Sequence, residues 1–353
     1  MYLRPLWEKE SRHVYGESGL FQGEKPVRLL YKAEKILRVY NPTLKVEYKA
    51  FQHYIHTPGS DLLFPVPGSG ICGIGENAIF PDPARAVLYP ALDANAIKGG
   101  PEGKLLIFDN ASFFARHQIM VDYCAVEGSS FIELPAVSEK SLPRFRAKLK
   151  KGVAVTVNLI GDSISEGFNA TEFVKVPPFA PPYLNIFVQK LRKATGTHIA
   201  ALNSAVAGTG SRNAGAVSER WLDRFSDLLI IAYGMNEFSS VPAADYIKEL
   251  QSIMARKKAL HPETEFILVS SMPRNPLWGG ESASVSRCFA EALRELESES
   301  CAIADVHTLW AQVYEKKDFY DLTGNGVNHP NDYGHRLYAA VLTNIFKDLL
   351  NRI

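Results

Sequence analysis

One stretch decides the fold: Val155-Thr156-Val157-Asn158-Leu159-Ile160-Gly161-Asp162-Ser163-Ile164-Ser165-Glu166-Gly167. It begins as a run of β-branched and aliphatic residues, which is typical of a buried strand in a parallel sheet. The run breaks at Gly161-Asp162-Ser163, where a helix can begin. A strand end that leads into a helix N-terminus brings a side chain and free backbone N–H groups to one small space, as acyl transfer requires. A βα turn capped by Ser explains these residues equally well, so the rest of the chain decides.

Apolar strands alternate with helices after Val153. The predicted strands are Val155–Gly161, Ala200–Asn203, Asp227–Tyr233, Glu265–Ser270 and Ala302–Val306. The predicted helices are Tyr183–Ala194, Asn213–Phe225, Tyr246–Leu260, Ser284–Glu299 and the segment from Asp332 onward. This alternation predicts an α/β fold with a parallel sheet flanked by helices. Active sites of such sheets gather at the carboxyl ends of the strands, where the Ser163, Gly208, Asn236 and Met272 regions fall.

The chain before residue 140 has a different character. Short aromatic and β-branched runs, such as Val27–Tyr31, Ile36–Tyr40, Leu105–Phe108 and Gln118–Cys124, are separated by Gly, Pro and Asn clusters. This pattern predicts an all-β sandwich or jelly roll. The basic segment 141–152 is interpreted as a short helix or linker with a solvated charged face. We therefore expect a β-sandwich domain over 1–140, a linker over 141–152 and a catalytic domain over 153–353.

The amino-acid composition argues against some classes of partner. The 353 residues are 46% hydrophobic and 22% charged, with a formal net charge of +1. This balance argues against nucleic acid and anionic membrane surfaces as partners. The N-terminus lacks the apolar region of a signal peptide and no run is long enough to span a bilayer, so we expect a cytoplasmic protein. The scattered histidines have no metal-ligand spacing, and no cofactor or metal is implied.

Four separated blocks now coincide along the second part of the chain. They are Gly161-Asp162-Ser163, Gly208 within Ala205–Gly210, Gly234-Met235-Asn236, and Asn328-His329-Pro330-Asn331. In order and character they resemble the SGNH (GDSL-type) esterase superfamily, and the β-rich first part is similar to carbohydrate esterases that carry an N-terminal jelly roll. The resemblance implies a flavodoxin-like sheet, a serine esterase activity and an oxyanion hole made by Ser163, Gly208 and Asn236.

The chemistry of these residues agrees with the resemblance. Ser163 is a weak nucleophile until a base takes its proton, and His329 has the pKa range of such a base. Gly208 allows close approach of a backbone N–H, and Asn236 supplies a neutral amide donor. Asp162 is expected to hold the Ser163 turn through backbone hydrogen bonds.

The sequence leaves three alternatives for the group that orients His329. Family members commonly carry Asp three residues before the catalytic His, where this chain has Gly326. Asp321 could reach the ring, a backbone carbonyl could orient it, or Ser163 and His329 could work as a dyad. We favour the dyad with carbonyl support and rank Asp321 second. Asp305, His307 and His335 are assigned structural roles.

Three hypotheses follow. The first is a serine esterase that removes small acyl groups, acetyl foremost, from a small molecule or oligosaccharide. The second is a lysophospholipase or thioesterase for longer acyl chains, which a long apolar groove beside Ser163 would favour. The third is a carbohydrate-binding protein with an inert hydrolase fold, which a large separation of Ser163 and His329 would favour.

Overall fold

The computed structural model describes residues 2–238, 241–279 and 283–350. Its second part is built on five parallel strands in the order β11-β10-β12-β13-β14. Their bounds are β10 Val155–Gly161, β11 Ile199–Asn203, β12 Leu228–Ala232, β13 Glu265–Val269 and β14 Cys301–Ala304. This order is that of a flavodoxin-like sheet, so the predicted α/β class is confirmed.

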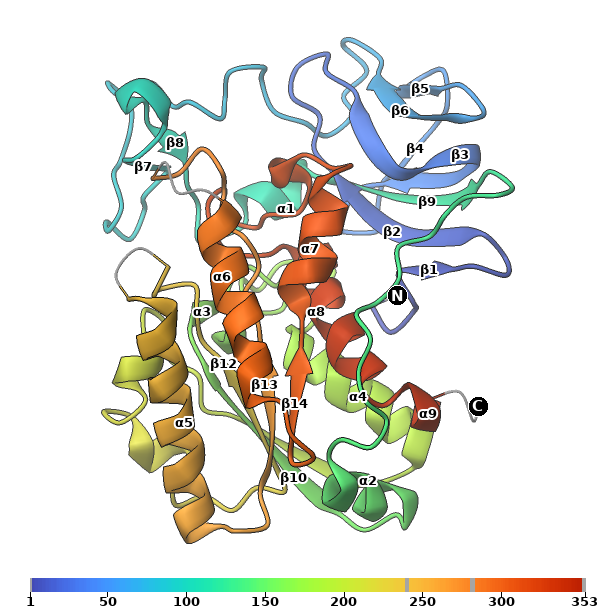
Figure 1. Ribbon diagram of the computed structural model, residues 1–353. Helices are drawn as coiled ribbons and strands as arrows, with labels where there is room; N and C mark the ends of the chain where they lie inside the picture. Colours follow the sequence, from blue (N-terminus) through green and yellow to red (C-terminus); the bar gives the residue numbers. More distant parts are fainter. Residues whose placement is uncertain (1, 239–240, 280–282, 351–353) are drawn as a thin grey trace.

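Helices flank the sheet (Figure 1). Their bounds are α2 Pro143–Lys150, α3 Ser163–Glu166, α4 Tyr183–Thr195, α5 Ala243–Leu260, α6 Ala283–Leu293, α7 Val306–Tyr314, α8 Asp332–Asn344 and α9 Lys347–Leu350. Helix α4 packs against α8 and α9, and α5 packs against α6. The chain leaves β10 for β11 on one side and then crosses to β12 on the other. The carboxyl ends of β10 and β12 therefore border the switch point at which such folds bind ligands.

The predicted β-rich character of the first part of the chain is confirmed, and its strands pair antiparallel (Figure 1, blue to teal). Seven strands form one sheet: β1 Trp7–Glu8, β2 His13–Gly19, β3 Val27–Tyr40, β4 Glu47–Tyr48, β5 Tyr54–His56, β6 Ser60–Pro65 and β9 Ile119–Ala125. A two-stranded sheet, β7 Ala96–Ile97 with β8 Leu106–Ile107, and the short helix α1, Phe113–His117, follow outside it. The jelly-roll topology stays a prediction.

The two parts share one continuous core. Buried side chains run from Val121 and Tyr123 of β9, through Leu337 of α8, to Leu159 and Ile230 of the parallel sheet. The division of the chain into domains at residues 141–152 stays a prediction. Within the described ranges, no helix combines the length and the apolar character that crossing a membrane requires.

Three local predictions differ from the structure. The two predicted strands Val27–Tyr31 and Ile36–Tyr40 form a single strand, β3, whose register shifts where bulges occur. In α2, Arg146 is buried rather than solvated, because its guanidinium binds the backbone carbonyl of Ser141 and the carboxylate of Asp348.

The predicted helix Asn213–Phe225 is absent, and the short 3₁₀ turns Ser211–Asn213 and Ser218–Arg220 occupy this region. The buried ammonium of Lys257 binds the backbone carbonyls of Trp221, Leu222 and Arg224. These carbonyls have a charged partner, so a helical hydrogen-bond ladder is not needed to satisfy them.

Candidate active site

The candidate nucleophile lies where β10 turns into α3. Asp162 caps the helix, because its carboxylate accepts the backbone N–H of Ile164 at 3.0 Å, and Ser163 is the first helical residue. Gly161 is required at the strand end, since a Cβ there would lie 2.5 Å from the carbonyl oxygen of Ala232. The turn therefore holds Ser163 at the carboxyl edge of the sheet, and the expected role of Asp162 is confirmed.

His329 meets Ser163 across this edge. The distance from Ser163 Oγ to His329 Nε2 is 2.9 Å, which is hydrogen-bond reach. His329 ends a closed loop in which the side-chain oxygen of Asn325 accepts the backbone N–H groups of Val327, Asn328 and His329. The loop therefore presents the imidazole in a fixed position.

Asn169 contacts the other ring nitrogen. Its Oδ1 lies 2.8 Å from His329 Nδ1. Its Nδ2 donates to the carbonyl oxygens of Gly324 at 2.9 Å, Asp109 at 3.2 Å and Ala111 at 3.3 Å. Three acceptors around Nδ2 settle the orientation of the amide, so Oδ1 faces the ring and Nδ1 carries the proton. The lone pair of Nε2 is then directed at Ser163.

Asn169 was not among the residues predicted from the sequence. It lies six residues after Ser163, whereas the predicted third residue, Asp321, lies in the segment before His329. Asn169 adopts a φ of 62°, a left-handed conformation that Asn tolerates better than most residues. An Asn in the turn that follows the Ser163 helix was the available signal.

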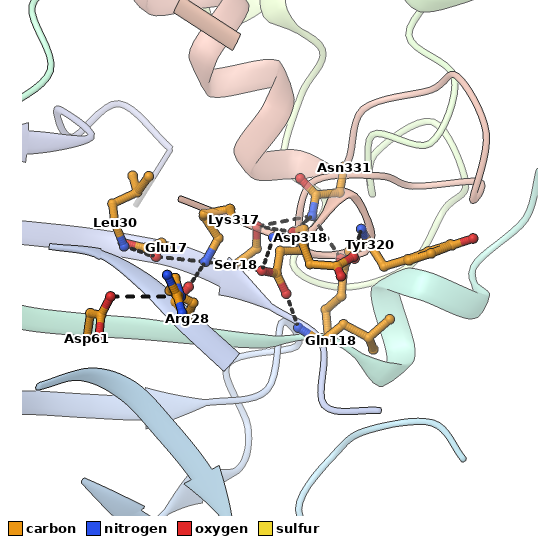
Figure 2. A network of polar contacts seen from close by, with 12 residues as sticks. Glu17, Ser18, Arg28, Leu30, Asp61, Gln118, Lys317, Asp318, Tyr320 and Asn331 are labelled. Carbon is orange, nitrogen blue, oxygen red and sulfur yellow. Dashed lines mark hydrogen bonds and ion pairs between the residues drawn. The ribbon is translucent and has the colours of Figure 1, made fainter. Parts of the chain in front are cut away.

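Asp321 does not contact His329 in this structure, so its tentative assignment as the third residue is not supported. Its carboxylate accepts the backbone N–H of Leu20 at 2.7 Å and lies 3.5 Å from the ammonium of Lys317. Lys317 in turn pairs with Glu17 of β2 (Figure 2). The side chains of Asp321, Lys317 and Glu17 are all buried. Attraction within this ion cluster directs Asp321 toward the N-terminal sheet. The imidazole is oriented by a side-chain carbonyl, and neither by a backbone carbonyl nor by Asp321.

The three predicted oxyanion donors come from loops that are joined at the end of β10. The backbone N–H of Val206 and the hydroxyl of Thr209 both donate to the carbonyl of Gly161. Asn236 is exposed, and its Nδ2 donates to the carbonyl of Thr209 at 2.8 Å. Gly208 lies in the loop between Val206 and Thr209, and its φ of 75° favours glycine. Ser163, Gly208 and Asn236 thus belong to one connected loop cluster, and their oxyanion role remains a proposal.

Glu237 fastens two of these loops together. One carboxylate oxygen accepts the backbone N–H of Ser211, and the other accepts that of Gly234 at 3.1 Å. Burial raises the pKa of Glu237 and, together with the charge of Glu237, raises the pKa of Asp162 to about 7. The carboxylate of Glu237 is thus long enough to span both loops.

Burial also sets the state of His329. It lowers the pKa of the imidazole to about 3, with a smaller contribution from His335. The ring is therefore neutral near pH 7, as a proton acceptor must be.

The remaining candidates have structural contacts: Asp305 caps α7, His307 Nε2 lies 3.0 Å from Ser286 Oγ, and His335 Nε2 lies 3.2 Å from the Phe168 carbonyl. In the described part of the chain, no three His, Cys, Asp or Glu side chains are grouped so that they could hold a metal ion.

Comparisons with known proteins place this geometry in a family. Residues 159–337, about half of the chain, match the model of the GDSL-like lipase/acylhydrolase family. No curated protein matches the sequence.

Similar solved structures include a two-domain esterase (CEX) active on acetylated mannans, which is 18% identical with a TM-score of 0.47 over 62% of this chain and 58% of that one. The chain thus spans little more than half the length of that esterase. LAE5, an alpha/beta hydrolase from the metagenome of Lake Arreo, is 18% identical with a TM-score of 0.46, over 55% and 96% of the two chains. The acetylxylan esterase Axe2 of Geobacillus stearothermophilus is 19% identical with a TM-score of 0.44, over 54% and 94%. By the match over residues 159–337, which contains Ser163, Asn169 and His329, this chain belongs to the GDSL-like lipase/acylhydrolase family.

Proposed function

We propose that the protein is a serine esterase that removes small acyl groups, acetyl foremost, from a carbohydrate. The observation that carries this proposal is the hydrogen-bonded series from Ser163 through His329 to Asn169, with distances of 2.9 and 2.8 Å. The short distance between Ser163 and His329 supports an active enzyme over an inert fold. Membership of an acylhydrolase family supports ester hydrolysis.

In this mechanism His329 Nε2 takes the proton of Ser163 as Oγ attacks the ester carbonyl. The tetrahedral oxyanion accepts hydrogen bonds from the backbone N–H groups of Ser163 and Gly208 and from the amide of Asn236. The imidazolium then gives its proton to the leaving alcohol, and an acyl-enzyme forms on Ser163. His329 next takes a proton from water, which attacks the acyl group, and it returns that proton to Ser163 Oγ as the bond between Oγ and the acyl carbon breaks and the acid leaves. Asn169 keeps the ring in the productive tautomer throughout.

A small acyl group suits the surroundings of the nucleophile. Ser163 is only 7% exposed and His329 only 5% exposed. The ring of Phe168 meets the imidazole edge-on, with 5.2 Å between the ring centroids. The ring of Phe168 beside a buried nucleophile supports a preference for acetate over palmitate.

Hydrolysis of p-nitrophenyl esters from acetate to palmitate tests the proposal. The wild-type enzyme is expected to cleave the acetate fastest, with rates that fall as the acyl chain lengthens. Ser163→Ala is expected to lose at least about a thousandfold in kcat. A rate maximum on long chains would instead favour a lipid or thioester substrate. Wild type and Ser163→Ala that are equally silent on every ester would contradict the proposal.

Acetylated xylan and acetylated mannan, on which the similar esterases act, form the second substrate panel. Release of acetate from either polymer, and its loss in Ser163→Ala, is the result expected for a carbohydrate esterase. Cleavage of p-nitrophenyl acetate without any release from these or other acetylated sugars would contradict the carbohydrate part of the proposal.

A further inference from the structure

The loop that carries His329 is a closed structure of its own. It leaves the 3₁₀ turn Phe319–Asp321 and returns to α8. The backbone N–H of Gly324 donates to the carbonyl of His329 at 2.8 Å, and that of Asn331 donates to the carbonyl of Leu322 at 2.9 Å. The loop thus has two paired arms, an outgoing arm over 320–324 and a returning arm over 329–331. His329 lies on the returning arm. A shift of one arm against the other would move the imidazole.

A single side chain of the N-terminal sheet binds both arms. Gln118 directly precedes β9 and is 2% exposed. Its Nε2 donates to the carbonyls of Tyr320 and Thr323 on the outgoing arm, each at 2.9 Å. Its Oε1 accepts a hydrogen bond from Nδ2 of Asn331 on the returning arm, also at 2.9 Å (Figure 2). The primary amide therefore uses both its donors and its acceptor on the loop.

Strand β2 supports the same loop from beside Gln118. The hydroxyl of Ser18 donates to the carbonyl of Asp321 at 2.5 Å, and the ammonium of Lys317 pairs with Glu17 at 2.8 Å (Figure 2). Glu17 and Lys317 are fully buried, so the pair is shielded from the screening that weakens exposed ion pairs. The outgoing arm is thus attached to the N-terminal sheet at its start and, through Gln118, at its end.

We propose that Gln118 is a positioning residue for His329, and that the N-terminal sheet is the platform on which the general base is held. Gln118 does not touch the reacting atoms. It acts by fixing the distance between the two arms of the histidine loop. A misplacement of about 1 Å at a catalytic group can cost about a hundredfold in rate. The kinetic part of this inference rests on the proposed esterase function, whereas the structural part does not.

The variant Gln118→Met tests the inference, because it keeps the length of the side chain and removes both donors and the acceptor. On p-nitrophenyl acetate we expect kcat to fall about tenfold or more with little change in KM. Amide hydrogen exchange is expected to speed up at Gly324 and Asn331, whose N–H groups close the loop. Ser18→Ala, a milder change, is expected to speed up exchange in the same loop to a smaller extent and remains informative if Gln118→Met does not fold.

Tyr48→Phe is the matched control. Tyr48 lies on β4 of the same sheet, which pairs with β3, and its hydroxyl contacts Cys72 in the loop after β6. The control is expected to lower Tm by a similar amount and to leave kcat and loop exchange at the wild-type values. Gln118→Met with wild-type kcat and wild-type loop exchange, or with a reduced kcat but unchanged loop exchange, would overturn the inference. A wild type that hydrolyses no ester would refute the proposed function, and the exchange data would still decide whether Gln118 holds the loop.

Discussion

Asn169 serves two kinds of partner at once. Its carbonyl oxygen faces the N–H of His329 Nδ1, and its NH₂ group faces three backbone carbonyls. A carboxylate would satisfy the imidazole equally well but would direct its second oxygen at these carbonyls. The site therefore fits Asn and not Asp, although Asp is the residue usually associated with catalytic histidines.

The variant Asn169→Asp should for this reason be worse than the wild type. We expect its Tm to fall, because a buried acceptor facing three acceptors costs roughly 2–4 kcal/mol. Its kcat on p-nitrophenyl acetate should fall by about tenfold or more, and Asn169→Ala should lose about a hundredfold. Thermal unfolding and steady-state kinetics of both variants test this. An Asn169→Asp enzyme that is as stable as the wild type and faster would contradict the assignment.

The pH dependence of His329 gives a second prediction at this scale. Burial lowers the pKa of the ring to about 3 from its ordinary value of 6.5, so the neutral, basic form persists well below pH 6.5. The acidic limb of kcat/KM, which reports the free enzyme, should therefore have its midpoint below 6.5. A midpoint at 6.5 or above would contradict a buried base.

Burial of His329 also lowers the stability of the folded protein at acidic pH. Below about pH 6.5 the unfolded chain takes up a proton at this histidine while the folded protein does not. Its contribution to the free energy of unfolding therefore falls as the pH is lowered. Rates at acidic pH need to be measured beside a Tm at each pH, so that loss of folded protein is not read as titration of the base.

At the scale of elements, the proposed oxyanion donors Gly208 and Asn236 lie in the loops that follow β11 and β12. Glu237 joins them by accepting one backbone N–H from each loop, and Gly210 leaves room for it, since a Cβ there would lie 2.8 Å from its Oε1. The proposed oxyanion role of Gly208 and Asn236 requires that these two loops keep a fixed spacing.

Glu237→Gln should disturb this spacing, because an NH₂ group would face one of the two backbone N–H groups. We expect kcat to fall about tenfold, which is less than the loss reported for deleting an oxyanion donor outright. Glu265→Gln is the control. Glu265 is also buried and accepts two backbone N–H groups, those of Arg144 and Phe145, but at the beginning of β13, at the opposite edge of the sheet. Equal losses of kcat in the two variants would argue against a specific role of Glu237.

At the scale of the molecule, the two parts of the chain are held as one unit. Besides the shared core, Arg336 of α8 donates to the carbonyls of Tyr15, Gly16 and Pro5 in the N-terminal part. We therefore expect a single unfolding transition in calorimetry. Arg336→Met should lower the Tm of that transition as a whole, since it removes the hydrogen bonds to these carbonyls, of which that of Gly16 is buried. Two separate transitions, with only one moved by Arg336→Met, would show that the parts unfold independently.

The sequence predicts what depends on local pattern. The apolar run of β10 and its break at Ser163 predicted the strand and the turn, and the order of the four blocks predicted that Ser163 and His329 meet. What it did not predict depends on contacts distant in sequence. The orientation of the Asn169 side chain depends on the carbonyls of residues 109, 111 and 324. The backbone conformation of the segment 213–225 depends on Lys257, more than thirty residues away. Asp321 was proposed because it lies upstream of His329, yet Lys317 and the N-terminal sheet direct it away from the imidazole.

The most direct test of the account is to react the folded protein with a fluorophosphonate and locate the adduct by peptide mass spectrometry. An activated serine should be labelled alone, so we predict one adduct, on Ser163, that is lost in Ser163→Ala and strongly slowed in His329→Ala. Ser165, whose hydroxyl is bonded to Tyr183, should stay unlabelled, and Ser165→Ala should leave labelling of Ser163 in place. Label on another serine, or no label on folded wild-type protein, would contradict the claim that His329 activates Ser163.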